Sequence, residues 1–435
     1  MCDREVLAIA QLGLAFLSVL TAFNGQGFIE VAILKDLAED PTSGVTSNSG
    51  YYSLALIYTS MSIFNIICPT IINKLGPKWP MAIGSLFYIV FMLGFMKISL
   101  YMLYFLSALL GIGASLMWTA SGVFLVEFSS PGNLQRNTGI LWSLIQTSHF
   151  VGGGCILIGL KDHDLKSGYI MIYMIFAALG AVSVFLYAAL PNRPFHVGKA
   201  LPCNTKEEIT IMGDLKKMGN LVCAPKMYGS LLMFLYMGME TTFSNTVFTT
   251  CVTSTRQLSE GKEEIVAYLI LSMSLGHVLG SIFLGIWAPF PEKFGIRWIV
   301  ILGLVLHYVA FILSYLVFPA SAPLGKTWEI GPMEPRMDIY VLVSFLLGVA
   351  SACWHTQSMV MIGDIFVGSE LPAAFALYKL FQTVAASAVY IYSAHLLLHW
   401  QLIIASIFGF FGLWFFLVVH KSATEEENIK RNRLP

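Results

Sequence analysis

Twelve long apolar segments constrain this chain more than any other feature of its sequence. A transmembrane helix needs about 20 mostly apolar residues, with a range of roughly 17 to 25. The segments are residues 6–34, 51–73, 80–96, 101–128, 138–160, 169–190, 228–252, 265–288, 298–318, 339–363, 373–398 and 402–419. Only 11% of the residues are charged, against about 25% in soluble domains. The sequence therefore predicts an all-α membrane protein with twelve transmembrane helices in a lipid bilayer.

The composition argues against several functional classes. The formal net charge is zero and no block of Lys and Arg occurs, so no nucleic-acid partner is predicted. The seven cysteines are scattered, lie mostly inside apolar segments and lack zinc-type spacing, so they are interpreted as packing residues. No nucleophile and base stand at a recognisable spacing. We expect no enzymatic activity, no metal site and no cofactor.

The distribution of basic residues predicts the orientation in the membrane. If the N-terminus is cytosolic, 16 of the 25 Lys and Arg residues fall on the cytosolic side, eight fall on the other side, and Lys379 lies within a segment. Cytosolic connections are normally enriched in Lys and Arg. A multi-pass protein with both termini in the cytosol is predicted, in either the plasma membrane or an endomembrane.

An internal repeat groups the twelve segments into two sets of six. Residues 141–147 (LWSLIQT) match residues 377–383 (LYKLFQT), and residues 109–111 (LLG) match residues 346–348 (LLG). A third match joins the first loop, residues 73–78 (NKLGPK), to the second loop, residues 292–297 (EKFGIR). Three matches in chain order indicate two six-helix repeats in parallel orientation.

The predicted domain boundaries follow from this repeat. Residues 1–190 form an N-terminal six-helix bundle, residues 191–227 a cytosolic linker, residues 228–420 a C-terminal six-helix bundle, and residues 421–435 a cytosolic tail. In the linker, apolar residues recur at helical spacing over residues 205–223. This pattern predicts an amphipathic helix opened by a capping box of Thr205 and Glu208. The tail is expected to be solvated and disordered, with a sorting or lipid-headgroup contact as the alternative.

Two charges lie deep inside apolar segments. Glu240 is at the middle of residues 228–252, and Lys379 lies about two turns inside residues 373–398. A charged side chain near the bilayer centre costs about 2.5 to 3.5 kcal/mol on insertion scales, so it usually faces the protein interior and has a partner. The sequence predicts an intramembrane pair of Glu240 and Lys379, either in direct contact or bridged by one water.

Further polar residues within the segments are candidates for a central cavity that binds a solute. They are Asn24, Gln26, Glu30, Thr119, Thr242, Asn245, His355 and Gln357. Two alternatives stay open for Glu30, which is either solvated near the outer end of its segment or part of the cavity. His355 is either a substrate or proton ligand or a packing residue. Hydrogen-bonded packing is expected of His149, His277 and His307.

The two loops resemble the signature of the major facilitator superfamily, which implies that superfamily's fold. In that signature an acid, a basic residue, a glycine and a further basic residue brace the cytosolic gate. The matching residues are Asn73, Lys74, Gly76 and Lys78 in the first loop and Glu292, Lys293, Gly295 and Arg297 in the second. Asn73 stands where the signature has an acid, and Pro77 and Ile296 stand where it has basic residues.

Within that superfamily the chain is similar to the uncoordinated-93-like (ion channel regulatory protein) family, and most similar to its major facilitator domain-containing protein eleven branch. Four segments carry this resemblance: residues 238–243 (GMETTF), 118–120 (WTA), 136–140 (RNTGI) and 397–402 (LLHWQL). The resemblance implies one of two functions. The chain is either a secondary carrier of a small solute or proton that works by alternating access, or a non-transporting partner of a channel subunit or other membrane protein.

Overall fold

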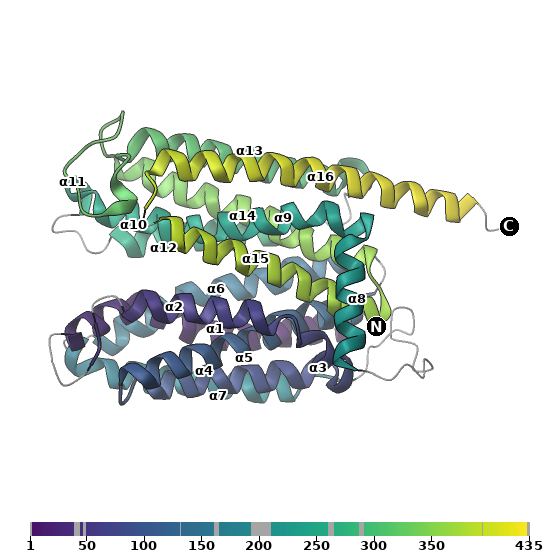
Figure 1. Cartoon of the computed structure of the whole chain (residues 1–435), viewed down its shortest axis with the longest axis horizontal. Helices are drawn as coiled ribbons and strands as arrows, with labels where there is room; N and C mark the ends of the chain where they lie inside the picture. Colours follow the sequence, from purple (N-terminus) through teal and green to yellow (C-terminus); the bar gives the residue numbers. More distant parts are fainter. Residues whose placement is uncertain are drawn as a thin grey trace. The chain divides into compact units, whose positions relative to one another are not determined.

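The computed structural model describes residues 2–38, 44–46, 49–130, 132–160, 165–192, 210–259, 265–286, 291–393 and 395–432 (Figure 1). Across these ranges the chain is almost wholly helical, and the β structure is limited to an isolated bridge between Thr255 and Thr327. The chain divides into two compact units, which we name unit 1 (Met1–Leu215) and unit 2 (Lys216–Pro435).

Unit 1 holds seven long or medium helices. They are α1 (Cys2–Ala38), α2 (Ser49–Phe64), α3 (Cys68–Leu75), α4 (Lys78–Gly94), α5 (Leu100–Glu127), α6 (Leu134–Leu160) and α7 (Leu165–Ala188). The next helix, α8 (Ile211–Cys223), contains the boundary between the units.

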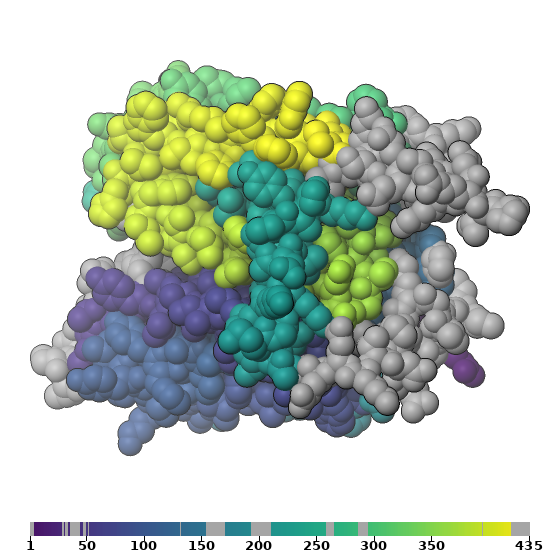
Figure 2. Space-filling view, turned by 45° about the vertical axis from the view of Figure 1, so that its right-hand side comes forward, coloured from purple at the N-terminus to yellow at the C-terminus, as the bar shows by residue number. Residues whose placement is uncertain are grey.

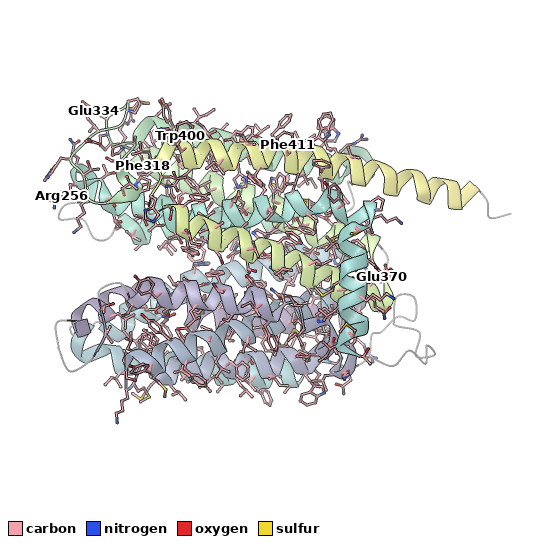
Figure 3. All side chains as sticks on the ribbon, viewed as in Figure 1. Arg256, Phe318, Glu334, Glu370, Trp400 and Phe411 are labelled. Atoms are coloured by element: carbon pink, nitrogen blue, oxygen red, sulfur yellow. The ribbon has the colours of Figure 1, made fainter. Side chains whose placement is uncertain are left out.

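Unit 2 has six long helices with short helical pieces between them. The elements are α9 (Pro225–Thr242), the π-helix η1 (Phe243–Val247), α10 (Phe248–Ser254), α11 (Arg256–Ser259), α12 (Ile265–Ile286), α13 (Pro291–Val317), η2 (Ala322–Leu324), α14 (Met337–Ile365), η3 (Gly368–Glu370), α15 (Leu371–Ser393) and α16 (Leu398–Asn432). Side chains fill the interior of the bundle (Figure 3); among them, the labelled Phe318 packs against Phe248 and Tyr340.

Within the described ranges, each of the twelve predicted segments coincides with a helix or with a helix that is broken once. Eight helices are long and apolar enough to cross a membrane alone, and two bent pairs pass the same test together. One of these pairs is α2 with α3, which meet at 63°. Pro69 explains the bend, because a proline inside a helix has no N–H to donate and its ring clashes with the carbonyl four residues earlier, here that of Asn65. The all-α membrane fold is therefore confirmed.

The two units repeat one packing pattern. In unit 1, α5 packs on α2 and α4, and α7 packs on α1 and α4; in unit 2, α14 packs on α12 and α13, and α16 packs on α9 and α13. Equivalent glycines make equivalent contacts. A Cβ atom added at Gly111 would lie 2.3 Å from the Ile57 carbonyl oxygen, and one added at Gly348 would lie 2.1 Å from the Met273 carbonyl oxygen. These glycines let the paired helices approach closely.

The two loops repeat at the level of the backbone as well. Gly76 ends α3 with φ 71° and ψ 171°, and Gly295 kinks α13 with φ 63° and ψ 149°. This region of backbone space is essentially restricted to glycine. The shared conformation explains why both copies of the loop have glycine at the same place.

Two expectations about the connections change. Helix α16 continues to Asn432, so the tail is helical over residues 421–432 and is not the disordered segment that the sequence suggested. Glu426 and Glu427 precede Lys430 and Arg431 by four residues, a spacing that favours helix. In the linker, α8 is capped by Thr210, whose Oγ1 accepts the N–H of Gly213 at 3.1 Å. The predicted capping box of Thr205 and Glu208 lies outside the described residues.

Candidate functional site

Glu240 lies fully buried on α9, at the centre of a polar cluster in unit 2. Two imidazoles contact its carboxylate. His307 on α13 places Nε2 3.3 Å from Glu240 Oε2, and His355 on α14 places Nε2 3.3 Å from Glu240 Oε1. Each carboxylate oxygen therefore has one imidazole nitrogen beside it.

Two hydroxyls complete the surroundings of the carboxylate. Ser351 Oγ donates to Glu240 Oε2 at 2.5 Å, and Thr241 Oγ1 donates to Glu240 Oε1 at 3.0 Å. Thr241 Oγ1 also lies 3.1 Å from His355 Nε2. A buried carboxylate is costly unless hydrogen bonds or charges compensate it. Here four side chains from three helices share that role.

Tyrosines extend the cluster at both ends. Tyr236 Oη lies 2.8 Å from His307 Nδ1, and Tyr378 Oη lies 3.3 Å from His355 Nδ1. The result is a continuous series from Tyr236 through His307, Glu240 and His355 to Tyr378, which we name the Glu240 chain. Every member can donate or accept a proton, and a histidine can take a proton on one ring nitrogen and release one from the other.

Local backbone features bring these helices together. Gly238 lies one turn before Thr242, and a Cβ atom added there would lie 2.0 Å from the Gln382 carbonyl oxygen of α15. Directly after Thr242 the helix widens into the π-helix η1. Single-turn π-helices occur often at functional sites. Ring packing holds the far end of the cluster, where Tyr236 meets Trp354 at a centroid distance of 4.8 Å.

Lys379 lies close to the Glu240 chain, but not on the carboxylate. Its ammonium donates to Gln382 Oε1 at 2.9 Å and lies 4.5 Å from the centroid of the Tyr378 ring. The groups within ion-pairing distance of Glu240 are His307 and His355. The predicted direct contact between Glu240 and Lys379 is therefore not found in the structure, which describes both residues. In α15 it is Tyr378, one residue earlier, whose side chain reaches His355. Coupling between the two charges stays a prediction.

The other candidates in unit 2 have separate partners. Thr242 Oγ1 donates to the Gly238 carbonyl within its own helix at 2.9 Å, and Asn245 is exposed on η1. Gln357 is buried on α14, where its Nε2 donates to Thr356 Oγ1 at 3.3 Å. His355 is thus the predicted cavity residue that the structure joins to Glu240.

The candidates in unit 1 form three small sets. Asn24 Nδ2 donates to Ser148 Oγ at 2.9 Å. Gln26 donates to Glu30, and both side chains are buried, which removes the solvated alternative for Glu30. Thr119 Oγ1 donates to Asn65 Oδ1 at 3.1 Å.

The loop residues differ in their contacts. Asn73 Nδ2 donates to Asp214 Oδ1 at 3.2 Å, and Lys78 Nζ donates to Asn192 Oδ1 at 3.0 Å. Lys74 and Arg297 are exposed. The side chains of Glu292 and Lys293 lie outside the described residues.

Sequence reasoning missed several residues of the buried polar clusters, His307 and Glu5 among them. His307 looked like an isolated packing histidine, and nothing in its apolar surroundings relates it by spacing to Glu240. Glu5 was overlooked because an acid in a first helical turn resembles a solvated helix end. In unit 1 its buried carboxylate accepts from Ser130 Oγ at 2.6 Å and Asn137 Nδ2 at 2.5 Å, and lies 3.6 Å from Arg136. The segment of residues 136–140 could have indicated a buried acid nearby, because it sets an arginine beside an asparagine.

Comparisons with known proteins give consistent results. The family model described as "Ion channel regulatory protein UNC-93" matches residues 40–417. "UNC93-like protein MFSD11" from Xenopus laevis is 31% identical over 97% of this chain and 98% of its own length. "Protein unc-93 homolog A" from Homo sapiens is 23% identical over 92% of this chain and 90% of its own length.

Solved structures resemble the fold. The proton:xylose symporter XylE of the major facilitator superfamily matches with a TM-score of 0.69 at 12% identity, covering 95% of each chain. The fucose:proton symporter FucP of E. coli matches with a TM-score of 0.65 at 12% identity, covering 95% of this chain and 99% of its own. The expected all-α fold of the major facilitator superfamily is thus confirmed.

Proposed function

This chain belongs to the UNC-93 family, and from that premise we propose that it is a secondary carrier that couples movement of a small solute to movement of a proton. The observation that carries the proposal is the Glu240 chain. An ionisable group buried within membrane-spanning helices is costly and by default supports the hypothesis of a functional site, with its partners indicating the role. The partners of Glu240 are the imidazoles of His307 and His355, and imidazoles readily bind and release protons.

The geometry supports a role for proton binding in helix movement. When Glu240 is charged, its two oxygens attract the imidazoles of α13 and α14 and the Ser351 hydroxyl. Protonation of the carboxylate removes that charge and one acceptor site, so the links between α9 and the other two helices weaken. A proton can thus bias which arrangement of these helices is stable. The π-helix η1 that follows Glu240 offers a place for α9 to bend.

The residues that bind the solute are proposed to be among the polar residues within the membrane-spanning helices. Asn24, Thr119, Thr242 and Gln357 keep this role as candidates, because polar residues within membrane-spanning segments often mark a substrate pathway. The similar structures are described as proton symporters of xylose and fucose. Those sugars are the substrates of those proteins, and the solute of this chain is proposed only as a small polar molecule.

The proposal can be tested by uptake in proteoliposomes that contain the purified protein. A panel of radiolabelled sugars, amino acids and carboxylates would be offered with and without an imposed pH gradient. We expect at least one solute to accumulate in a gradient-dependent way, and Glu240→Gln to abolish the gradient dependence. Gradient-independent leakage at the same rate in both proteins would contradict coupling at Glu240.

A second function is favoured by the description of the matching family model, which names ion channel regulation. In that case the Glu240 chain is a static clasp between α9, α13 and α14. If no solute of the panel is taken up and one channel subunit co-purifies at constant stoichiometry, the regulatory function is supported over the carrier. The two functions therefore predict opposite outcomes in the same preparation.

A further inference from the structure

The two copies of the repeated loop differ in charge at their first position. The second loop begins with Glu292, whereas the first begins with Asn73 and contains no acid anywhere in residues 73–78. The remaining pattern is shared, with lysine second and glycine fourth in both copies. An acid that is absent from one copy of an internal repeat raises the question of whether another part of the chain supplies it.

In unit 1 a buried acid of the linker contacts the first loop. Asp214 lies in the first turn of α8, and its Oδ1 accepts the Asn73 Nδ2–H bond at 3.2 Å. The Asp214 side chain is only 4% exposed, which is unusual for an aspartate. A carboxylate in a first helical turn also interacts favourably with the helix dipole. Asp214 thus lies in the first turn of α8 and contacts the loop from there.

The contact is a single hydrogen bond. Within the described part of the chain, Asp214 Oδ2 and Asn73 Oδ1 are buried without a hydrogen-bond partner. The basic residues of the loop point elsewhere, since Lys74 is exposed and Lys78 donates to Asn192. One bond can open without dismantling a network. Figure 2 shows α8, in teal, at the surface of the molecule, where Ile211 and Met212 are exposed.

We propose that Asp214 serves as the acid of the first loop and that its bond to Asn73 latches the linker helix α8 onto α3. The loop joins α3 to α4, so the latch connects the linker to the turn between two membrane-spanning elements of unit 1. Opening of the latch during a transport cycle rests on the proposed carrier function. The contact between Asp214 and Asn73 does not depend on that function.

Amide hydrogen exchange of the purified full-length protein tests the latch, and the key variant moves the acid from one partner to the other. Asp214→Asn should speed exchange of the α8 amides about tenfold or more, because the hydrogen bond from Asn73 loses its charged acceptor. In the double variant Asn73→Asp with Asp214→Asn, the amide of residue 214 can donate to the new carboxylate at residue 73. Exchange of α8 should then return to within about twofold of the wild-type rate.

Two controls keep the test decisive. Asn73→Ala removes the donor from the other side and should speed α8 exchange as Asp214→Asn does, while unchanged exchange in α4 and α5 shows that the variants are folded. Glu370→Gln, which removes an exposed acid of unit 2 (Figure 3), should leave α8 unchanged. A double variant that exchanges as fast as Asp214→Asn would overturn the latch, since Asp214 would then act only on its own helix end. No solute is needed, so failure of the carrier assay would not affect this result.

Discussion

At the scale of single residues, the contacts of Glu240 rank its partners. His307 and His355 touch the carboxylate at 3.3 Å, whereas the ammonium of Lys379 donates to Gln382. Removing one partner of a buried charge pair typically costs about 3 to 5 kcal/mol. We expect Glu240→Gln and His355→Gln each to lower the melting temperature in detergent strongly, and the double variant to lose much less than the sum.

The same double-mutant cycle applies to Lys379. The Lys379 ammonium lies over the Tyr378 ring, and Tyr378 contacts His355, which in turn contacts Glu240. We therefore expect the coupling of Glu240 with His355→Gln to be about 1 to 3 kcal/mol, and its coupling with Lys379→Met to be smaller. Glu370→Gln is the exposed control and should shift stability by less than about 0.5 kcal/mol. A larger coupling with Lys379 than with either histidine would contradict the contacts described here.

Some residues of the Glu240 chain could be predicted from the sequence, and others could not. Glu240 and His355 were identifiable because a carboxylate or an imidazole deep in an apolar segment is costly and needs a reason. Their mutual contact was not identifiable, since α9 and α14 meet only in the folded bundle. His307 lacked any signal of its own, because α13 is otherwise apolar around it and its partner lies 67 positions earlier in the sequence.

At the scale of helices, two glycines support equivalent crossings. An alanine at Gly348 would place its Cβ 2.1 Å from the Met273 carbonyl oxygen, and one at Gly111 would clash with Ile57 in the same manner. Backbone atoms cannot move aside cheaply, so we expect each substitution to destabilise its unit by about 1 to 3 kcal/mol. Thermal unfolding in detergent measures this loss.

Gly153→Ala on α6 is the matched control, because nothing lies within 4 Å of the added Cβ atom. Alanine also has a higher helix propensity than glycine, by about 1 kcal/mol, so this control should be neutral or stabilising. Equal losses at Gly153 and Gly348 would mean that the repeated crossing does not depend on the close approach of the helices.

The length and apolar character of the segments were sufficient to predict where the spans lie. They did not predict where a span is broken. Pro69 could have indicated a bend between α2 and α3, but the 63° angle between these helices depends on packing. The π-helix η1 has no sequence signature that separates it from the surrounding α-helix. The helical extension of α16 was missed because the charged composition outweighed the four-residue spacing of Glu and Lys or Arg.

At the scale of the whole molecule, the two units share their helix packing but differ in their buried polar contacts. Both units use the same helix packing, yet their buried acids have different partners. In unit 2 Glu240 contacts two histidines, whereas in unit 1 Glu5 contacts serine, asparagine and arginine, Glu30 contacts Gln26, and Asp214 contacts Asn73. Repeated sequence segments could therefore predict the architecture of both halves. They could not predict the polar sites, which occupy positions that the two copies do not share.

The orientation in the membrane is a further prediction for the whole chain. Tags at the N-terminus, near Thr205 and at the C-terminus should all be accessible only after the membrane is permeabilised, because Lys and Arg are concentrated on that side. An extracellular tag between α1 and α2 serves as the positive control for surface protein. Antibody binding to any of the three cytosolic tags on intact cells would contradict the orientation.

Glu240 is proposed to bind the coupling proton, and a comparison of solute exchange with uphill accumulation tests this role. The solute is first identified by the uptake panel. Proteoliposomes with the wild-type protein should then exchange this solute across the membrane, and an imposed proton gradient should drive its accumulation. Glu240→Gln, which mimics the protonated carboxyl group, should retain exchange and lose gradient-driven accumulation. Accumulation by Glu240→Gln at the wild-type level would contradict the account.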